Sequence, residues 1–236
     1  MSAPFEPLHL RPTAPLAGRV LLPGDPGRAL ALAQVVLGDD RRMFNHHRGL
    51  WGYTGTAADG APLTIQSTGM GGPSAAIVLE ELARLGVRRA IRVGTARAIA
   101  DGLAPGALVA ATEVRAEDGT SRELLVAAAE PALALDPDLA AALATATPHA
   151  GPLVSHDVLY APDGARRPEW RAAGVLAADL ETAALAAVAL HHGIALGALV
   201  VIAADASGAR LDDEALAAAS ETAGEAAAAA LIATDG

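Results

Sequence analysis

The chain of 236 residues contains no cysteine, and only 3% of its residues are aromatic. The absence of cysteine excludes disulfides, thiolate nucleophiles and cysteine-ligated metal sites. Because aromatic side chains are so scarce, the core must be built from Ala, Val, Leu and Ile, which the 52% hydrophobic content supplies. The length fits one large domain, residues 1–236, better than two small ones.

Basic residues and long apolar runs are also scarce. The net charge of −10 and the pI of about 5.1 argue against nucleic acid or an anionic membrane as the main partner. The longest apolar stretch, residues 193–204, is shorter than the ~20 residues that a membrane span needs. The amino-terminal segment has no basic residues followed by an apolar run, so it predicts no secretory signal. We therefore expect a cytoplasmic protein with no nucleic-acid or membrane partner.

Short runs of apolar and β-branched residues alternate with longer segments typical of helices. This alternation favours a single α/β domain with a central sheet that is largely parallel or mixed. Residues 116–148, rich in Ala and interrupted by proline, resist assignment. Strands are expected over residues 19–22, 63–68, 89–93, 106–114, 150–155 and 196–204. Helices are expected within residues 26–38, 73–86, 174–193 (after a brief strand) and 212–233.

Two glycine-rich turns follow expected strands. In the first, Gly24 to Arg28, backbone N–H groups at a helix start and the Arg28 guanidinium can bind an anion. The alternative is a tight turn with a solvated arginine. The second turn, residues 67–72, lacks the lysine of a P-loop and the spacing of the dinucleotide fingerprint. It indicates a close backbone approach, either to a ligand or to another strand.

Arg92 lies inside an otherwise apolar strand that the sequence predicts to end in a turn at Gly94 and Thr95. Such a turn at a strand end is where open α/β sheets bind ligands. A buried cation requires a partner, and either an anionic ligand or a carboxylate elsewhere in the fold would provide one. We favour the ligand. Arg97 follows where another small residue would be expected.

Acidic residues follow two later strands. Asp179 and Glu181 either begin a helix, as N-cap and first-turn residue, or Glu181 accepts hydrogen bonds from ligand hydroxyls. Asp205 follows the apolar strand 196–204 and would act as a general acid if its pKa were raised. Its alternative role is to cap the turn at Ser207. The adjacent histidines at 46–47 have no further ligand at metal spacing, so no metal site is expected.

The order of these stretches resembles the nucleoside phosphorylase-I family, above all the bacterial hexameric purine nucleoside phosphorylases and their uridine phosphorylase relatives. The similarity runs from about His9 to the final helix. It is carried by PGDPGRA (23–29), NHHRGLWGYTG (45–55), STGMGGPSAAIVLEEL (67–82), IRVGTA (91–96), DLETAAL (179–185) and AAD (203–205).

The resemblance implies an α/β fold around a mixed, barrel-like sheet flanked by helices. It implies a homohexamer arranged as a trimer of dimers, with residues 1–18 at a subunit interface. The implied reaction is reversible phosphorolysis of a nucleoside, purine preferred, to the free base and ribose 1-phosphate. Inorganic phosphate is then the co-substrate, and neither a cofactor nor a metal is implied.

The resemblance also assigns residues to parts of the site. Asp205 matches the aspartate that protonates or hydrogen-bonds N7 of the leaving base. The phosphate would be held by Gly24, Arg28, Arg92, Gly94, Thr95 and, from a neighbouring subunit, Arg48. The ribose would meet Met70, Leu180, Glu181 and the His9 of a neighbouring subunit, and the base would meet Ala96, Arg97, Leu159 and Ala178.

Departures from the family pattern concentrate around the base. Arg97 replaces a glycine that lets the backbone approach the base, Leu159 replaces an aromatic residue, and Arg210 is the only arginine near Asp205 towards the carboxyl terminus. Three alternatives therefore stay open. A uridine phosphorylase would need a pyrimidine-reading insertion, which is not found between residues 155 and 175. A nucleoside hydrolase would lack the arginine of PGDPGRA, and a degenerate nucleoside-binding paralogue would have its base site filled by Arg97.

Overall fold

The computed structural model describes residues 5–125, 132–160 and 167–235. Within them, one ten-stranded sheet has the order β10-β6-β8-β9-β5-β1-β4-β3-β2, with β7 beside β6 and a further pairing between β10 and β5. The strands are β1 (Arg19–Pro23), β2 (Arg42–Asn45), β3 (Gly52–Thr56), β4 (Pro62–Gln66), β5 (Arg89–Ala98), β6 (Leu108–Ala116), β7 (Ala132–Ala134), β8 (Ala150–Ser155), β9 (Ala177–Asp179) and β10 (Ala195–Ala204). The helices are α1 (Pro26–Val36), α2 (Gly72–Leu85), α3 (Gly119–Leu124), α4 (Pro137–Ala144), α5 (Arg167–Ala172), α6 (Thr182–His192) and α7 (Asp213–Ala233), with a short 3₁₀ turn, η1 (His47–Gly49).

The extra pairing closes part of the sheet into a ring. Strands β10, β6, β8, β9 and β5 follow one another, and β5 pairs again with β10. Strand β5 runs parallel to β1 and β10 and antiparallel to β9, so the sheet is mixed. The predicted α/β fold with a mixed, barrel-like sheet is therefore confirmed.

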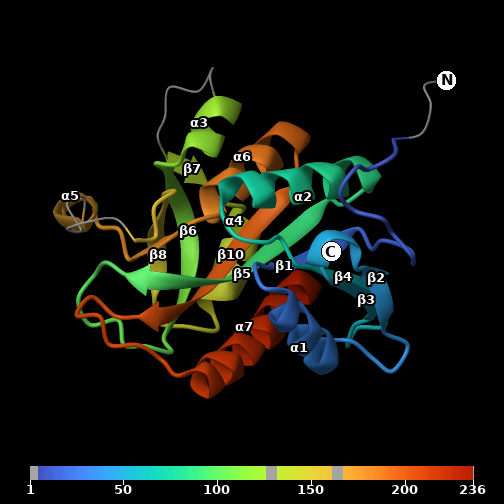
Figure 1. The fold of residues 1–236 in the computed structure, drawn as a ribbon. Coiled ribbons are helices and arrows are strands. Elements are labelled where there is room, and N and C mark those ends of the chain that lie inside the picture. The colour runs from blue at the N-terminus through green and yellow to red at the C-terminus, as the bar shows by residue number, and fades with distance from the viewer. Residues whose placement is uncertain (1–4, 126–131, 161–166, 236) are drawn as a thin grey trace.

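Helices cover both faces of the sheet. In Figure 1, α2, α3 and α6 lie on one side, and α1 and α7 lie on the other. Each side has its own cluster of buried side chains, and both clusters consist mainly of Ala, Val, Leu and Ile, as the composition requires. The small residues allow close packing: a Cβ on Gly224 of α7 would lie 2.2 Å from Cδ2 of Leu32 in α1.

Helix ends match the signals in the sequence. Asp25 caps α1 by accepting a hydrogen bond from the Arg28 N–H at 2.7 Å, and Asp212 caps α7. Gly86 and Gly193 end α2 and α6 with left-handed backbone at φ 116° and 64°. The four predicted helices are confirmed. None of the helices in the described residues is long and apolar enough to cross a lipid bilayer.

Two expectations need correction, and one segment that was left unassigned is now described. The predicted turn at Gly94 and Thr95 is wrong, because β5 continues to Ala98, held by β10 on one side and β9 on the other. Glu181 is not in the first turn of α6 but immediately precedes the helix. The segment that resisted assignment contains α3, β7 and α4, while residues 126–131 lie outside the described residues.

Candidate active site

The candidate site extends from Arg92, inside β5, to the carboxyl ends of β1, β5, β9 and β10 and the turns that follow them. Its centre is an ion triad formed by Arg92 of β5 with Asp179 at the end of β9 and Glu181 just before α6. Arg92 Nε donates to Asp179 Oδ2 at 2.9 Å, and Nη2 donates to Glu181 Oε2 at 2.5 Å. The sequence left two possible partners for Arg92, an anionic ligand or a carboxylate of the protein. The structure provides two such carboxylates, Asp179 and Glu181.

Burial and charge act on Arg92 in opposite directions. Its side chain is 2% exposed, and burial alone would lower its pKa, but the charges and hydrogen bonds of Glu181 and Asp179 outweigh burial and raise the pKa. Nη1 of the same guanidinium is buried and has no hydrogen-bond partner in the described residues. The triad thus leaves one buried donor group of Arg92 unsatisfied.

Gly94 makes room for this guanidinium. A Cβ at Gly94 would lie 2.7 Å from Nη2 and 2.8 Å from Cζ of Arg92. Because the backbone at Gly94 is ordinary strand, the glycine is required for space rather than for a turn conformation.

Further hydrogen bonds support the triad. Ser155 donates to Asp179 Oδ1 at 2.5 Å and accepts from the Ala183 N–H at 2.9 Å. The Gly71 N–H donates to Glu181 Oε1 at 2.7 Å. The sequence interpretation missed Ser155 as a support and treated Asp179 only as a cap. The sequence did indicate that a buried Arg92 needs an anionic partner, but it did not indicate which carboxylate would be that partner.

The two glycine-rich turns pack against each other beside the triad. The Gly69 N–H donates to the Gly24 carbonyl at 3.0 Å, and a Cβ at Gly24 would lie 3.3 Å from the Gly69 carbonyl oxygen. The close approach predicted for residues 67–72 is therefore an approach to another strand end. Arg28 of α1 is half-buried nearby. Its pKa is lowered by burial, raised by Asp25, lowered by Arg92 and raised by Glu181, with a net lowering.

Asp205 follows β10 and caps its own turn. Its Oδ1 accepts hydrogen bonds from Ser207 Oγ at 2.7 Å, from the Gly208 N–H at 2.9 Å and from the Ala209 N–H at 3.0 Å. The hydroxyl of Ser207 is the main cause of a lowered pKa at Asp205. The raised pKa that a general acid needs is not found, and the geometry is that of the alternative turn-capping role.

Arg97 lies in the sheet between two residues that precede acidic side chains. It pairs with Ala178 of β9, next to Asp179, and with Ala204 of β10, next to Asp205. Its Nε is buried and has no hydrogen-bond partner in the part of the chain that the structure describes, and a Cβ at Gly208 would lie 3.7 Å from its Nη2. The predicted base residues Ala96 and Ala178 are buried beside it.

Two residues that the resemblance assigns to a neighbouring subunit, His9 and Arg48, are linked through His47. His9 Nδ1 bonds to Glu81 Oε1 at 2.8 Å, and the His9 carbonyl lies 2.9 Å from Nδ1 of His47. Arg48 follows in η1, exposed and with left-handed backbone at φ 60°. Among the described residues, no hydrogen bond or ion pair joins either His9 or Arg48 to Arg92.

The remaining predicted residues differ in exposure. Thr95 and Leu180 are half-buried at the candidate site. Met70 is 90% exposed and Leu159 is 58% exposed, so more than half of each side chain is open to solvent in this chain. The structure therefore brings together the predicted phosphate residues of one chain with Glu181, and leaves Met70 and Leu159 on the surface.

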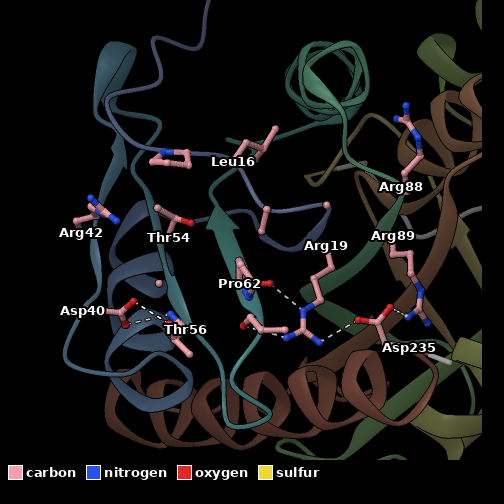
Figure 2. A pocket seen from close by; sticks show the side chains of 15 residues that line it. Leu16, Arg19, Asp40, Arg42, Thr54, Thr56, Pro62, Arg88, Arg89 and Asp235 are labelled. Atoms are coloured by element: carbon pink, nitrogen blue, oxygen red, sulfur yellow. Dashed lines mark hydrogen bonds and ion pairs between the residues drawn. The ribbon is translucent and has the colours of Figure 1, made fainter.

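A cavity of about 590 Å³ lies at the opposite ends of the strands (Figure 2). Two of the arginines that line it, the buried Arg19 and the half-buried Arg89, form ion pairs. Arg19 bonds to Asp59 at 2.6 Å, and Arg89 bonds to Asp235 at 2.9 Å. In Figure 2, Arg19 and Arg89 both point towards Asp235. Because these charges are compensated within the chain, the cavity does not share the unsatisfied donor found at Arg92.

No group of three or more His, Asp or Glu side chains within the described residues is arranged to hold a metal ion. What the carboxyl-end site offers is guanidinium and backbone donors near a carboxylate with free lone pairs. Such a site can bind an anion and a hydroxylated ligand side by side.

Comparison with known proteins gives the class. A sequence model of the phosphorylase superfamily matches residues 19–234, so the chain belongs to that superfamily. It is 35% identical over 205 residues to the guanosine phosphorylase of Halorubrum lacusprofundi, covering 82% of this chain and 83% of that protein. It is 34% identical over 185 residues to a DeoD-type purine nucleoside phosphorylase of Clostridium perfringens, covering 76% and 78%.

The fold agrees with this class. A uridine phosphorylase structure from Vibrio fischeri, in complex with 6-hydroxy-1-naphthoic acid, superimposes with a TM-score of 0.82 at 24% identity, covering 93% of both chains. The resemblance to nucleoside phosphorylases stated from the sequence is confirmed.

Proposed function

We propose that this protein catalyses phosphorolysis of a nucleoside, with purine nucleosides preferred. The observation that carries the proposal is the buried guanidinium of Arg92, which keeps an unsatisfied Nη1 while two carboxylates hold it in place. Membership of the phosphorylase superfamily and the named activities of the curated relatives support it.

Arg92 and Arg28 are the proposed phosphate ligands of this chain. A phosphate dianion would accept from the free Nη1 of Arg92, from the guanidinium of Arg28 and from backbone N–H groups at the start of α1. Gly24, Gly94 and Thr95 line the same position by resemblance. A bound dianion next to the sugar both attacks C1′ and stabilises the positive charge that develops there.

Glu181 is the proposed ribose ligand. A carboxylate has about four lone-pair sites, and only two hydrogen bonds to it are described, from Gly71 and Arg92. The rest can accept from the 2′- and 3′-hydroxyls, with Leu180 and Met70 beside the sugar. In the reaction, a phosphate oxygen forms a bond to C1′, the C1′–N9 bond breaks, and the base leaves with the electron pair and takes up a proton.

The resemblance assigns delivery of that proton to Asp205. Because its pKa is lowered, little of Asp205 is protonated at neutral pH, and this assignment predicts a rate that rises as the pH falls. No metal or organic cofactor is proposed, so a chelator should leave the rate unchanged.

The test is a panel of nucleosides incubated with and without phosphate, with free base and ribose 1-phosphate separated by chromatography. The proposal expects cleavage only when phosphate is added, and loss of cleavage in Arg92→Gln. Equal cleavage without phosphate would identify a hydrolase. Binding of nucleosides without any cleavage would identify a degenerate paralogue, and preference for uridine would reverse the base assignment.

We further propose a cytoplasmic homohexamer built as a trimer of dimers, in which His9 and Arg48 complete the site of a neighbouring subunit. Support comes from their contacts: His47, which precedes Arg48, bonds to the His9 carbonyl, and no hydrogen bond or ion pair among the described residues joins His9 or Arg48 to Arg92. The native mass should then be six times 23.6 kDa by light scattering. A monomer that is fully active would remove His9 and Arg48 from the site.

A further inference from the structure

Arg97 is a charged group at the candidate site for which the described residues provide neither an ion pair nor a partner for Nε. Its Nε is buried and has no hydrogen-bond partner, and no ion pair of Arg97 occurs among the described residues. By contrast, Arg92 has two carboxylate partners, and Arg19 and Arg89 share Asp235. A buried polar atom without a partner is destabilising, so Arg97 has the properties of a side chain whose partner is a ligand.

The surroundings of Arg97 place its guanidinium at one end of the site. Its Nη2 lies over the turn that follows β10, because a Cβ on Gly208 would be 3.7 Å from it. Arg167, at the start of α5, has its pKa lowered first by burial and then by the charge of Arg97. Two arginines therefore meet at this end, and the nearby Asp205 already uses Oδ1 to hold its own turn.

The position of this end follows from the strand. Arg97 lies five positions after Arg92 along β5, which is about 16 Å of extended backbone. If phosphate lies at Arg92 and ribose at Glu181, the base extends from the ribose towards Arg97. This inference therefore rests on the proposed function.

A guanidinium selects among bases by its pattern of donors. It offers parallel N–H groups and no acceptor. A 6-oxopurine presents two acceptors, O6 and N7, on one edge, and this edge is the one that arginine binds with two hydrogen bonds. A 6-aminopurine presents the N7 acceptor beside an amino donor, so one N–H of the arginine would face another donor. Uracil has no equivalent of N7.

We propose that Arg97 determines base specificity by donating two hydrogen bonds to O6 and N7 of a 6-oxopurine nucleoside. The contact strengthens as the C1′–N9 bond breaks, because negative charge then accumulates on the leaving base. A permanently protonated arginine also provides this stabilisation without a raised pKa at Asp205.

The experiment compares three nucleosides that differ at purine position 6: inosine, purine riboside and adenosine, each with phosphate. In the wild type, kcat/KM should fall in that order, with at least about tenfold between inosine and adenosine. Arg97→Gly should lower kcat/KM for inosine by about tenfold or more and bring the three values close together. Arg97→Lys, which keeps the charge but not the paired donors, should retain only part of the preference.

Controls separate the possible outcomes. Arg84→Gln removes an exposed arginine that pairs with Glu80 on α2, and it should leave the ratio unchanged. If Arg97→Gly does not fold, product inhibition of the wild type by hypoxanthine should still be at least about tenfold tighter than by adenine.

Equal wild-type rates on inosine and adenosine would overturn this inference alone. So would an equal gain on all three in Arg97→Gly, which would make Arg97 an obstruction. Absence of phosphate-dependent cleavage of any nucleoside would overturn the proposed function and this inference together.

Discussion

Replacing Gly94 with alanine should disrupt the ion triad without touching any of its charges. The new Cβ would lie 2.7 Å from Nη2, 2.8 Å from Cζ and 2.9 Å from Nε of Arg92. Ordinary contact begins at 3.4 Å, so the guanidinium must retreat by about 0.7 Å. It cannot do so freely, because Asp179 and Glu181 hold it at 2.9 and 2.5 Å inside the protein.

The expected loss follows from how Arg92 responds. If the guanidinium shifts but keeps both carboxylates, the loss is that of an overpacked core, about 1–3 kcal/mol. If it leaves the triad, two buried carboxylates lose their cation, and breaking a buried ion pair costs about 3–5 kcal/mol. In both cases the geometry of Nη1 changes, so the KM for phosphate should rise.

Urea unfolding followed by circular dichroism measures the first effect, and initial rates at varied phosphate measure the second. Gly18→Ala is the matched control, since a Cβ at Gly18 meets nothing within 4 Å and its φ is not in the left-handed range. That variant should be neutral or slightly stabilised. A Gly94→Ala variant with wild-type stability and an unchanged phosphate KM would refute the argument that Gly94 is needed for space.

Three further predictions concern carboxylates. Glu81 accepts from three consecutive backbone N–H groups and from the ring of His9, so Glu81→Gln should cost about 2 kcal/mol in urea and speed hydrogen exchange at residues 8–10; unchanged exchange would contradict this. The hydrogen bond from Arg19 lowers the pKa of Asp59 from 3.8 to about 2, so its stabilisation is complete above pH 4 and is lost as the pH falls towards 2. Asp59→Asn should therefore flatten acid unfolding in that range, and an unchanged profile would count against the ion pair. The lowered pKa of Asp205 argues against the proton delivery that the resemblance assigns to it, so Asp205→Asn, which keeps an oxygen acceptor for the turn, should retain kcat within about tenfold; a drop of about 10²–10⁴ would restore its role as a general acid.

The architecture was accessible from the sequence because its signals are local. Short apolar runs and the helical segments between them are recognisable within a few residues, and they predicted strands and the four helices that are found. The extent of β5 was not accessible. Residues 94–98 have little intrinsic preference for a strand, and pairing with β9 and β10 imposes that conformation.

The site was accessible only in part, for the same reason. Arg92 was recognisable as a buried cation, but its partner Asp179 is 87 residues away, and only the fold brings them together. Gly94 was correctly singled out for the wrong reason, since its small size serves a side chain two residues earlier. Whether the pKa of Asp205 is raised or lowered depends on a hydrogen bond from Ser207, which sequence spacing does not specify.

The pairing of β5 with β10 also constrains how the chain is made. Arg89 is synthesised long before Ala195, its neighbour in the sheet. During translation, the edge of β5 that later pairs with β10 is therefore unpaired. Exposed strand edges invite pairing with other chains, and pairings between distant residues form slowly. A chain released before Ala204 would carry Arg28 and Arg92 yet lack both the strand that covers β5 and the turn of Asp205. Such a product should aggregate rather than retain partial activity, so the site and the protection of β5 are completed together, near the end of synthesis.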